Sequence, residues 1–456
     1  MSDRPLAAEV RRLAFPAILH SLLQTSVFVV DRVMLGRHGE TSLAAMQLGG
    51  ALEWSIWSVF AAFEVGTIAR VGRHVGAGDA DAARLAARIS LVAALLMGCA
   101  LALASPILLE LLPYAAKNVS PAAVAEARGY LAVTIAASPL VFVATITVAT
   151  LQAGGDTRTP LAIGIAANIV HVGLNYVLIP RLGAQGAGIS TACTFGMEAV
   201  LATLALTSTA RPVSLRRSPA ALATLGPGVR AEGRVLASIA LPAFFERVLY
   251  HLGYVGYVLI IVRLGDAAMA ANQSLISIES ICFLSADGFG IAAAALVAQK
   301  LGAGEPAAAQ QVGRISARDA TITLTVFGVS AAALQSIILP VFSTDPAVLA
   351  IGRSAIPVLA LAQPFMAVGI VLAQALRGSG RTRDALGVSV IGAVVVRLSA
   401  TWFFAITLGL GLVGVWLGST LDWFVRSILL GLIWRRTTTR VAEAEATPRS
   451  ASRNAR

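Results

Sequence analysis

The chain has 456 residues, of which 57% are hydrophobic and only 13% are charged, and its mean hydropathy is +0.79. A soluble protein keeps about a quarter of its residues charged, so this composition excludes an ordinary soluble domain. The net charge of +11 suggests nucleic acid as a partner, but the Lys and Arg residues lie between apolar blocks and not along one face. We therefore predict a polytopic membrane protein that binds no nucleic acid.

Apolar blocks long enough to cross a bilayer recur along the chain. A helix needs about 20 apolar residues to span the hydrocarbon core. Hydropathy and the helix breakers between the blocks predict twelve membrane-spanning helices. They cover residues 13–36, 42–70, 85–113, 129–152, 160–180, 183–210, 235–262, 267–299, 315–342, 354–376, 385–409 and 412–434. An even number of spans puts both ends of the chain on the same side of the membrane.

The basic residues between the spans predict which side that is. With a cytoplasmic N-terminus, about 25 Lys and Arg residues fall on the cytoplasmic side and about 6 on the outer side. Short loops rich in Lys and Arg stay in the cytoplasm, so both termini are expected there. The first apolar block is too long for a signal peptide and lacks a cleavage site, so it should remain as a span. We predict a multi-pass protein of the inner, or plasma, membrane.

The second half of the sequence repeats the first. At an offset of 226 residues, "AFPA" (14–17) aligns with "ALPA" (240–243), "AAMQ" (44–47) with "AANQ" (270–273), and "VGAGD" (75–79) with "LGAGE" (301–305). Six spans align with six spans, so the two halves have the same orientation in the membrane. This pattern predicts an all-α membrane protein of twelve transmembrane helices in two pseudo-symmetric six-helix lobes. In transporters with such a parallel repeat, the substrate binds between the lobes.

The composition between and after the spans predicts the domain boundaries. We expect an N-terminal lobe at 1–210, a cytoplasmic linker at 211–234, a C-terminal lobe at 235–435 and a disordered cytoplasmic tail at 436–456. The linker, "RPVSLRRSPAALATLGPGVRAEGR", is basic, rich in Pro and Gly, and without helical periodicity. The lobes should therefore be joined by an irregular segment.

Several ionisable residues lie inside the predicted spans. An ionised side chain at bilayer depth costs about 2.5–3.5 kcal/mol on insertion scales, so it is paired, faces a cavity or is neutralised. Asp31, near the end of the first span, either pairs with a cation or changes its protonation, and the adjacent Arg32 points about 100° away from it. Arg397 requires a carboxylate, from either Glu279 or Asp422. Asp422 and Arg426 are four residues apart and are expected to pair.

Four motifs, in this order along the chain, resemble those of the multidrug and toxic compound extrusion (MATE) antiporters. They are "VDRVMLG" in the first span, "VGAGD" after the second, "LQAGGDTRTP" after the fourth, and "NQSLISIES" followed by "DGFGIAAAALVAQKLGAG" across the eighth. The resemblance covers about 10–435 and recurs in both halves. It implies a V-shaped pair of six-helix lobes that expels cationic or amphipathic small molecules. The driving force would be the inward flow of protons or sodium ions.

The resemblance also implies roles for single residues. Asp31 occupies the position of the family's coupling carboxylate, and Glu246 that of a functional acid in the seventh span. The fifth span of the family often carries Asn and Asp four residues apart, whereas here His171 and Asn175 align with them and Asn168 lies one turn earlier. The tenth span also lacks an acid that some sodium-coupled relatives carry. These departures weaken a sodium site and favour protons.

The predicted sites follow from these positions. Ion coupling is assigned to Asp31, His171, Asn168 and Asn175, and substrate or ion binding to Glu246, Glu53, Glu279, Gln47 and Gln273. Glu53 and Glu279 occupy equivalent positions in the repeat, and for this pair packing or charge pairing is the favoured role. Histidine is included because its charge changes in the physiological pH range.

Two other classes of function remain open. A flippase for lipid-linked oligosaccharide precursors shares the architecture, but its cavity should carry several basic residues, and arginines within the spans are few. An enzyme is disfavoured because there is no nucleotide loop and no nucleophile–base spacing. Cys99, Cys193 and Cys282 lie in apolar blocks without metal-ligand spacing. We expect no metal, no cofactor besides the coupling ion, only small-molecule substrates and lipid as partners, and a monomer.

Overall fold

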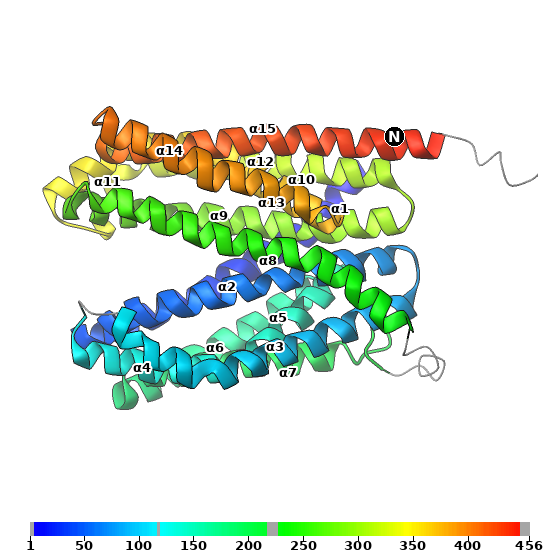
Figure 1. Ribbon diagram of the computed structural model, residues 1–456, viewed down its shortest axis with the longest axis horizontal. Helices are drawn as coiled ribbons and strands as arrows, with labels where there is room; N and C mark the ends of the chain where they lie inside the picture. Colours follow the sequence, from blue (N-terminus) through cyan, green and yellow to red (C-terminus); the bar gives the residue numbers. More distant parts are fainter. Residues whose placement is uncertain (1–3, 116–118, 217–226, 447–456) are drawn as a thin grey trace, which may run out of the picture. The chain divides into compact units, whose positions relative to one another are not determined.

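The computed structural model describes residues 4–115, 119–216 and 227–446 (Figure 1). Within these residues, all regular structure is helical. The helices are α1 (Arg4–His38), α2 (Glu40–Gly76), α3 (Ala80–Ala115), α4 (Pro121–Ala136), α5 (Ser138–Ala153), α6 (Arg158–Leu182), α7 (Ala184–Ala205), α8 (Pro227–Val262), α9 (Asp266–Gly302), α10 (Pro306–Ala333), α11 (Gln335–Ile338), α12 (Pro346–Gly378), α13 (Thr382–Ser389), α14 (Arg397–Trp402) and α15 (Gly411–Ala446). A 3-10 turn follows α11 at Leu339–Val341, and π-helical segments follow α13 and α14 at Val390–Val396 and Phe403–Thr407.

The helices correspond in order to the predicted spans. Of the described helices, nine are by themselves long and apolar enough to cross a membrane, and two bent pairs raise that number to eleven. The pairs are α4 with α5, bent by 51°, and α10 with α11, bent by 68°. The first bend lies beside Pro139, which has no backbone N–H to continue the helix. The second predicted span is α2, whose apolar residues are interrupted by Glu53 and Glu64.

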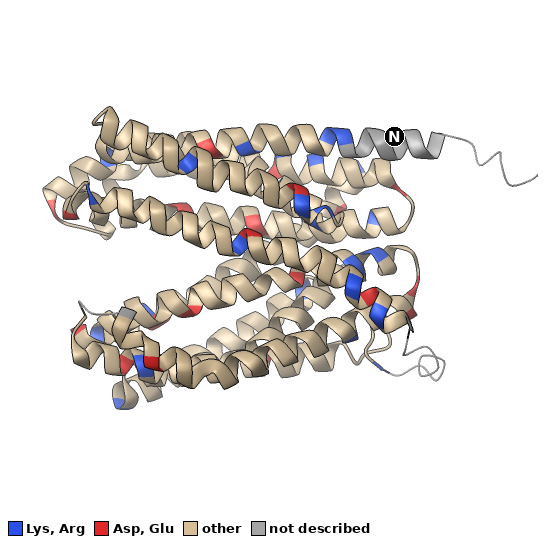
Figure 2. Ribbon diagram, viewed as in Figure 1, with Lys and Arg blue, Asp and Glu red and all other residues tan. Residues whose placement is uncertain are grey.

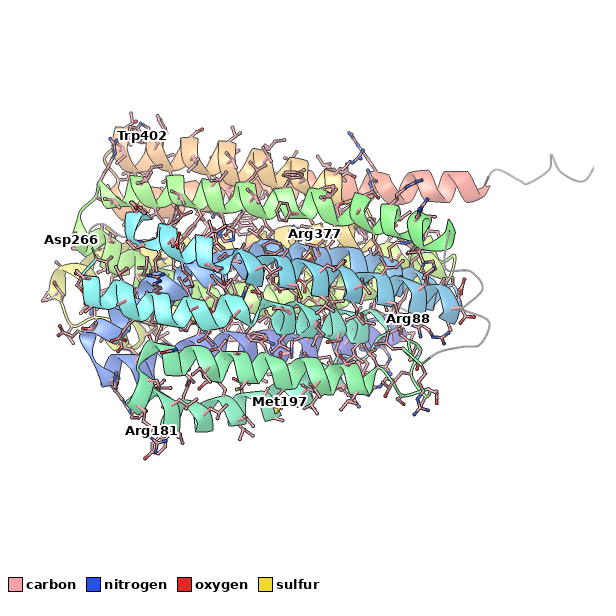
Figure 3. All side chains as sticks on the ribbon, turned by 60° about the horizontal axis from the view of Figure 1, so that its bottom comes forward. Arg88, Arg181, Met197, Asp266, Arg377 and Trp402 are labelled. Atoms are coloured by element: carbon pink, nitrogen blue, oxygen red, sulfur yellow. The ribbon has the colours of Figure 1, made fainter. Side chains whose placement is uncertain are left out.

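Charged residues are unevenly placed along these helices. Figure 2 shows most Lys, Arg, Asp and Glu toward the helix ends, with long uncharged stretches between them. Figure 3 shows Arg88 of α3 and Arg181 of α6 toward opposite ends of their bundle. This distribution is typical of helices whose middle turns lie in hydrocarbon.

The chain divides into two compact units whose boundaries differ from the predicted lobes. Unit 1 comprises Met1–Val10 and Gly253–Arg456, and unit 2 comprises Arg11–Leu252. The divisions therefore fall inside α1 and α8. The first turns of α1 belong to unit 1, and the first half of α8 belongs to unit 2.

Two expectations about irregular segments are wrong in part. The predicted linker is helical from Pro227 onward, because the beginning of α8 packs in unit 2 and makes an ion pair there. The predicted tail is helical as far as Ala446, since α15 continues through a run of Ala and Glu, which are strong helix formers. The rest of these expectations falls on 217–226 and 447–456, outside the described residues.

Ion pairs hold the beginning of α8 against α2 and the beginning of α1 against α9, and α2 and α9 are equivalent helices of the two repeats. In unit 2, Glu232 of α8 accepts a hydrogen bond from Arg70 Nε of α2 at 2.7 Å and lies 3.4 Å from His74 Nε2. In unit 1, Glu9 of α1 lies 3.5 Å from Lys300 Nζ of α9, and positions 74 and 300 are 226 residues apart. Burial by itself raises the pKa of Glu232, but hydrogen bonds from His74 and Arg70 and the charge on Arg70 outweigh it and lower this pKa to about 2.

Close packing holds the helices of each unit together. In unit 1, buried Trp416, Leu359 and Leu275 join one cluster contributed by α15, α12 and α9. A Cβ at Gly378, the last residue of α12, would lie 2.3 Å from the carbonyl oxygen of Ala294 on α9. Small residues at such contacts let helix backbones approach, which is how helices associate in lipid.

Candidate functional site

Asp31 is fully buried in the last third of α1. Its exposed fraction is 0%, and so are those of His171 and Asn175 on α6. These two residues are four apart and therefore lie on the same face of α6. His171 Nε2 lies 2.8 Å from Asp31 Oδ1, and Asn175 Nδ2 donates to the same oxygen at 2.6 Å. The structure thus brings together three of the four residues predicted for ion coupling.

Helix α7, which packs beside α6 (Figure 1), adds two threonines that the sequence analysis missed. Thr191 Oγ1 donates to Asp31 Oδ2 at 3.4 Å, and Thr194 Oγ1 lies 3.1 Å from His171 Nδ1. Both threonines are buried. Their three-residue spacing puts them on one face of α7, but threonine is too common in membrane helices for that spacing to stand out in the sequence.

Thr194 sets the direction of its hydrogen bond with His171. Thr194 donates its single hydroxyl hydrogen to the Ser190 carbonyl oxygen at 2.7 Å, so at His171 it accepts a bond from Nδ1–H. On the other side of the ring, His171 Nε2 lies 2.8 Å from Asp31 Oδ1 and 3.0 Å from Asn175 Nδ2. A proton between Nε2 and Oδ1 would make their contact a hydrogen bond.

Among the described residues, no Lys or Arg neutralises Asp31. Its partners are an imidazole, an amide and a hydroxyl group. Arg32 is exposed, and the buried Oδ1 of Asn175 has no hydrogen-bond partner within the described ranges. A buried carboxyl group without a fixed cation beside it is free to gain and lose a proton.

Asn168 lies outside this cluster. Its Oδ1 accepts a hydrogen bond from Ser26 Oγ at 2.8 Å, and its Nδ2 donates to the Gly164 carbonyl oxygen at 2.9 Å. The side chain is therefore near, but not bonded to, the Asp31–His171 pair. Its predicted part in ion coupling stays a prediction.

Glu53 of α2 is a second buried acid of unit 2. Its Oε2 accepts a hydrogen bond from Tyr130 of α4, and it lies close enough to Asp31 for their charges to interact. Oε1 of Glu53 and Oε1 of its repeat equivalent Glu279 both lack a hydrogen-bond partner in the described part of the chain. The Tyr130 contact supports the favoured packing role for Glu53, and a binding role stays a prediction.

Unit 1 holds its buried aspartate in a different way. Asp422 of α15, with an exposed fraction of 0%, accepts hydrogen bonds from Arg397 Nε at 2.8 Å and from Arg426 Nε at 2.6 Å. The predicted Asp422–Arg426 pair is confirmed, and Asp422 is the carboxylate that Arg397 requires. Arg426 also stacks over the ring of Trp423 at 3.8 Å. We interpret this as a structural ion cluster.

The other predicted binding residues lie apart from Asp31. Glu246 is buried on α8 and does not belong to the set that bonds Asp31. Gln47 on α2 and Gln273 on α9 are exposed. Their roles in binding stay predictions.

The sequence analysis also missed one of the buried acids of unit 2. Glu198 of α7, which is 3% exposed, accepts hydrogen bonds from Gln24 Nε2 of α1 at 3.2 and 3.1 Å. It is the single acid of the predicted span 183–210. An acid within a span is a functional candidate by default, so this signal was present in the sequence.

Comparison with known proteins identifies the family. The MatE family profile matches residues 16–177 and again residues 242–403, two matches that begin 226 residues apart. A probable multidrug resistance protein NorM of Bradyrhizobium diazoefficiens is 31% identical over 94% of this chain and 92% of its own length. The probable multidrug resistance protein NorM of Thermotoga maritima is 24% identical over 92% of this chain and 90% of its own length. The multidrug resistance protein PmpM of Pseudomonas aeruginosa is 28% identical, over 91% and 84%.

Solved structures share the whole fold. An outward-facing multidrug resistance MATE family transporter of the MOP superfamily superposes with a TM-score of 0.87 at 18% identity, covering 96% of this chain and 97% of that one. The eukaryotic MATE transporter AtDTX14 superposes with a TM-score of 0.82 at 19% sequence identity, covering 96% of this chain and 99% of that one. The fold and the repeat define a multi-pass membrane transport protein, which confirms the predicted fold class. The chain belongs to the MatE family.

Proposed function

We propose that the chain exports small cationic or amphipathic molecules in exchange for protons that move inward. The observation that carries the proposal is the buried Asp31–His171 contact, at which no Lys or Arg of the described residues pairs with the carboxyl group. The multidrug resistance names of the curated relatives support efflux of such molecules. Protons are favoured over sodium because an imidazole nitrogen faces the carboxyl group, whereas hard cations prefer oxygen ligands.

Coupling acts through the contacts of α1 with α6 and α7. When a proton from outside reaches the pair, the charge on Asp31 and His171 changes, and the hydrogen bonds from Asn175 and Thr191 change in strength with it. A ligand shifts a two-state protein only through a difference in affinity between the states. Protonation therefore favours the state that binds substrate weakly and releases it outward. Loss of the proton to the cytoplasm resets the transporter.

The remaining parts of the proposal follow from the loop charges and the fold. Both termini are cytoplasmic, the protein is a monomer in the inner (plasma) membrane, and it needs no cofactor besides the coupling ion. A flippase for lipid-linked oligosaccharides is the alternative. It is not favoured, because a pyrophosphate requires several available guanidinium groups, and two of the arginines within the predicted spans, Arg397 and Arg426, are engaged by Asp422.

Transport in proteoliposomes tests the proposal. Ethidium export is measured for the wild type and for Asp31→Asn, with the pH gradient and the sodium gradient varied independently. The wild type should respond to the pH gradient alone, and Asp31→Asn should lose that response. Asp81→Asn is the matched control, because Asp81 is an exposed acid at the start of α3. Full pH-driven export by Asp31→Asn, or export driven by sodium alone, would contradict proton coupling at this site.

A further inference from the structure

A second polar site lies in unit 2, about two to three turns along α1 from Asp31. Both carboxyl oxygens of Glu198 accept hydrogen bonds from the side-chain amide of Gln24. Within the described residues, Gln24 is the hydrogen-bonding partner of Glu198, and neither Lys nor Arg contacts it. A carboxyl group held by a neutral amide can exist with or without its proton.

A histidine faces the same place. His20 lies one turn before Gln24 on α1, is 6% exposed, and its Nε2 has no hydrogen-bond partner in the described ranges. A Cβ added at Gly164 of α6 would lie 3.2 Å from His20 Cδ2, 3.6 Å from His20 Nε2 and 3.9 Å from Glu198 Oε1. The imidazole nitrogen and the carboxyl oxygen therefore both border the space over Gly164, and the glycine leaves that space to them.

Further polar side chains lie on α6 and α7 between the Glu198 site and Asp31. On α6, Gly164, Asn168, His171 and Asn175 follow one another at helical spacing on one face, and on α7 so do Thr191, Thr194 and Glu198. Thr194 contacts His171, and Ser26 contacts Asn168, at 3.1 and 2.8 Å. Thr191 and Glu198 are seven residues apart, which is about 10 Å along the axis of α7. Glu198 is therefore a separate site, and Thr194, which contacts His171, lies one turn before it on α7.

The fold by itself does not require these residues. At the repeat offset of 226, Gln24 corresponds to Tyr250 and His20 to Glu246. At the offset of 225 that aligns "LQAGGDTRTPL" (151–161) with "LRGSGRTRDAL" (376–386), Glu198 corresponds to Trp423. The second repeat builds the same helices without this combination. Burying an acid within a membrane-spanning bundle costs free energy. Because the second repeat folds without these polar residues, we expect them to have a function in the first repeat.

Other titratable groups surround the site. The ones buried on helices packed against α7 are His20 and Asp31 on α1, Glu53 on α2, Tyr130 on α4 and His171 on α6, while α5 contributes none. Of these, His20 borders the space over Gly164 together with Glu198, and His171 contacts Thr194, which lies one turn before Glu198 on α7. Both neighbours can give a proton to the carboxyl group or take one from it.

We propose that Glu198, with His20 and Gln24, is a second proton-binding site that exchanges protons with the Asp31–His171 pair. In the transfer step, the carboxylate of Glu198 turns toward Thr194, which lies one turn before it on α7. The Nδ1 hydrogen of His171 then passes to Thr194 Oγ1, and the hydroxyl hydrogen of Thr194 passes to the carboxylate of Glu198. His171 becomes neutral, Glu198 becomes a neutral acid, and Thr194 ends as a hydroxyl. His20 Nε2 then accepts the proton from Glu198. The inference rests on the proton coupling of the proposed function.

Two transport modes in proteoliposomes separate a proton-transfer role from a structural one. Ethidium transport driven by a pH gradient requires net proton movement, whereas ethidium counterflow exchanges substrate for substrate and does not. Glu198→Gln keeps the shape of the side chain and removes its titration. It should slow pH-driven transport at least about tenfold, since a positioned proton-transfer group contributes on the order of 10²–10⁴. Counterflow should stay within about twofold of the wild type, because binding and conformational exchange are intact.

Matched variants complete the test. Gly164→Ala puts a methyl group into the space that His20 and Glu198 border, and it should also slow pH-driven transport while leaving counterflow intact. This variant tests the proposal if Glu198→Gln fails to fold. Glu126→Gln is the control, because Glu126 of α4 binds Ser42 at the end of the bundle. Unchanged pH-driven transport in Glu198→Gln, or an equal loss in both modes, overturns the proposal. A wild type without pH-driven transport refutes the proposed function itself, which distinguishes the two failures.

Discussion

The same substitution at the two fully buried aspartates, Asp31 and Asp422, should have opposite consequences. Asp31 has neutral or switchable partners, whereas Asp422 is bridged by Arg397 and Arg426. Changing either residue to Asn keeps its shape and removes its charge. If Asp31 serves coupling and Asp422 serves the fold, Asp31→Asn should lose transport and keep stability, and Asp422→Asn should lose stability.

The contacts give the magnitudes. Asp422→Asn leaves two guanidinium groups in the bundle and turns an amide toward one of them, and breaking a buried ion pair in this way costs about 3–5 kcal/mol. Glu279 lies close enough for its charge to interact with both arginines, which favours the lower end of that range. In Asp31→Asn the amide oxygen takes the place of Oδ1, where it still accepts from Asn175 and can accept from a protonated His171 Nε2. The amide nitrogen takes the place of Oδ2 beside the hydroxyl group of Thr191, so the cost is about 1 kcal/mol or less.

Thermal unfolding of the two variants in detergent, followed by tryptophan fluorescence, measures the difference. For a unit of roughly 200 residues, a loss of this size lowers the melting temperature of Asp422→Asn on the order of 10 °C. Asp31→Asn should melt within about 3 °C of the wild type. Equal losses in both variants, or a larger loss in Asp31→Asn, would refute the assignment of structural and coupling roles to these two acids.

Two further predictions concern packing and the ends of the helices. Glu232→Gln should lower the melting temperature, since it breaks the contact with Arg70. This deficit in melting temperature relative to the wild type should be full above pH 4.5 and shrink toward a pH of about 2. The reason is that the Glu232 carboxyl group stabilises the fold only while it is ionised. A deficit that is constant between pH 6 and pH 2.5 would contradict that linkage. Gly378→Ala should destabilise unit 1 by about 1–3 kcal/mol, since its methyl group meets the carbonyl oxygen of Ala294. A methyl group at Gly387 meets nothing within 4 Å, so Gly387→Ala should raise the free energy of unfolding by about 0.5–1 kcal/mol in the same assay. An equal loss of stability in both glycine variants would argue against the close contact between Gly378 and Ala294.

The sequence by itself determined the class, the span order and the repeat of this protein. Hydropathy depends on neighbours along the chain, and the 226-residue offset needs only a comparison of the sequence with itself, so neither requires knowledge of packing. The Asp422–Arg426 pair could be predicted for the same reason, since residues four apart share a helix face whatever surrounds them. The resemblance to MATE antiporters then selected Asp31, His171 and Asn175 as a group.

Only the tertiary structure decided which of the scarce polar groups meet. Glu198 and Gln24 are 174 residues apart and Arg70 and Glu232 are 162 apart, and the sequence does not reveal how far each helix is rotated or how deep it lies. Those two quantities set every contact between helices in a bundle. They also distinguish Asp422, which is held between two arginines in unit 1, from Asp31, which contacts a histidine in unit 2.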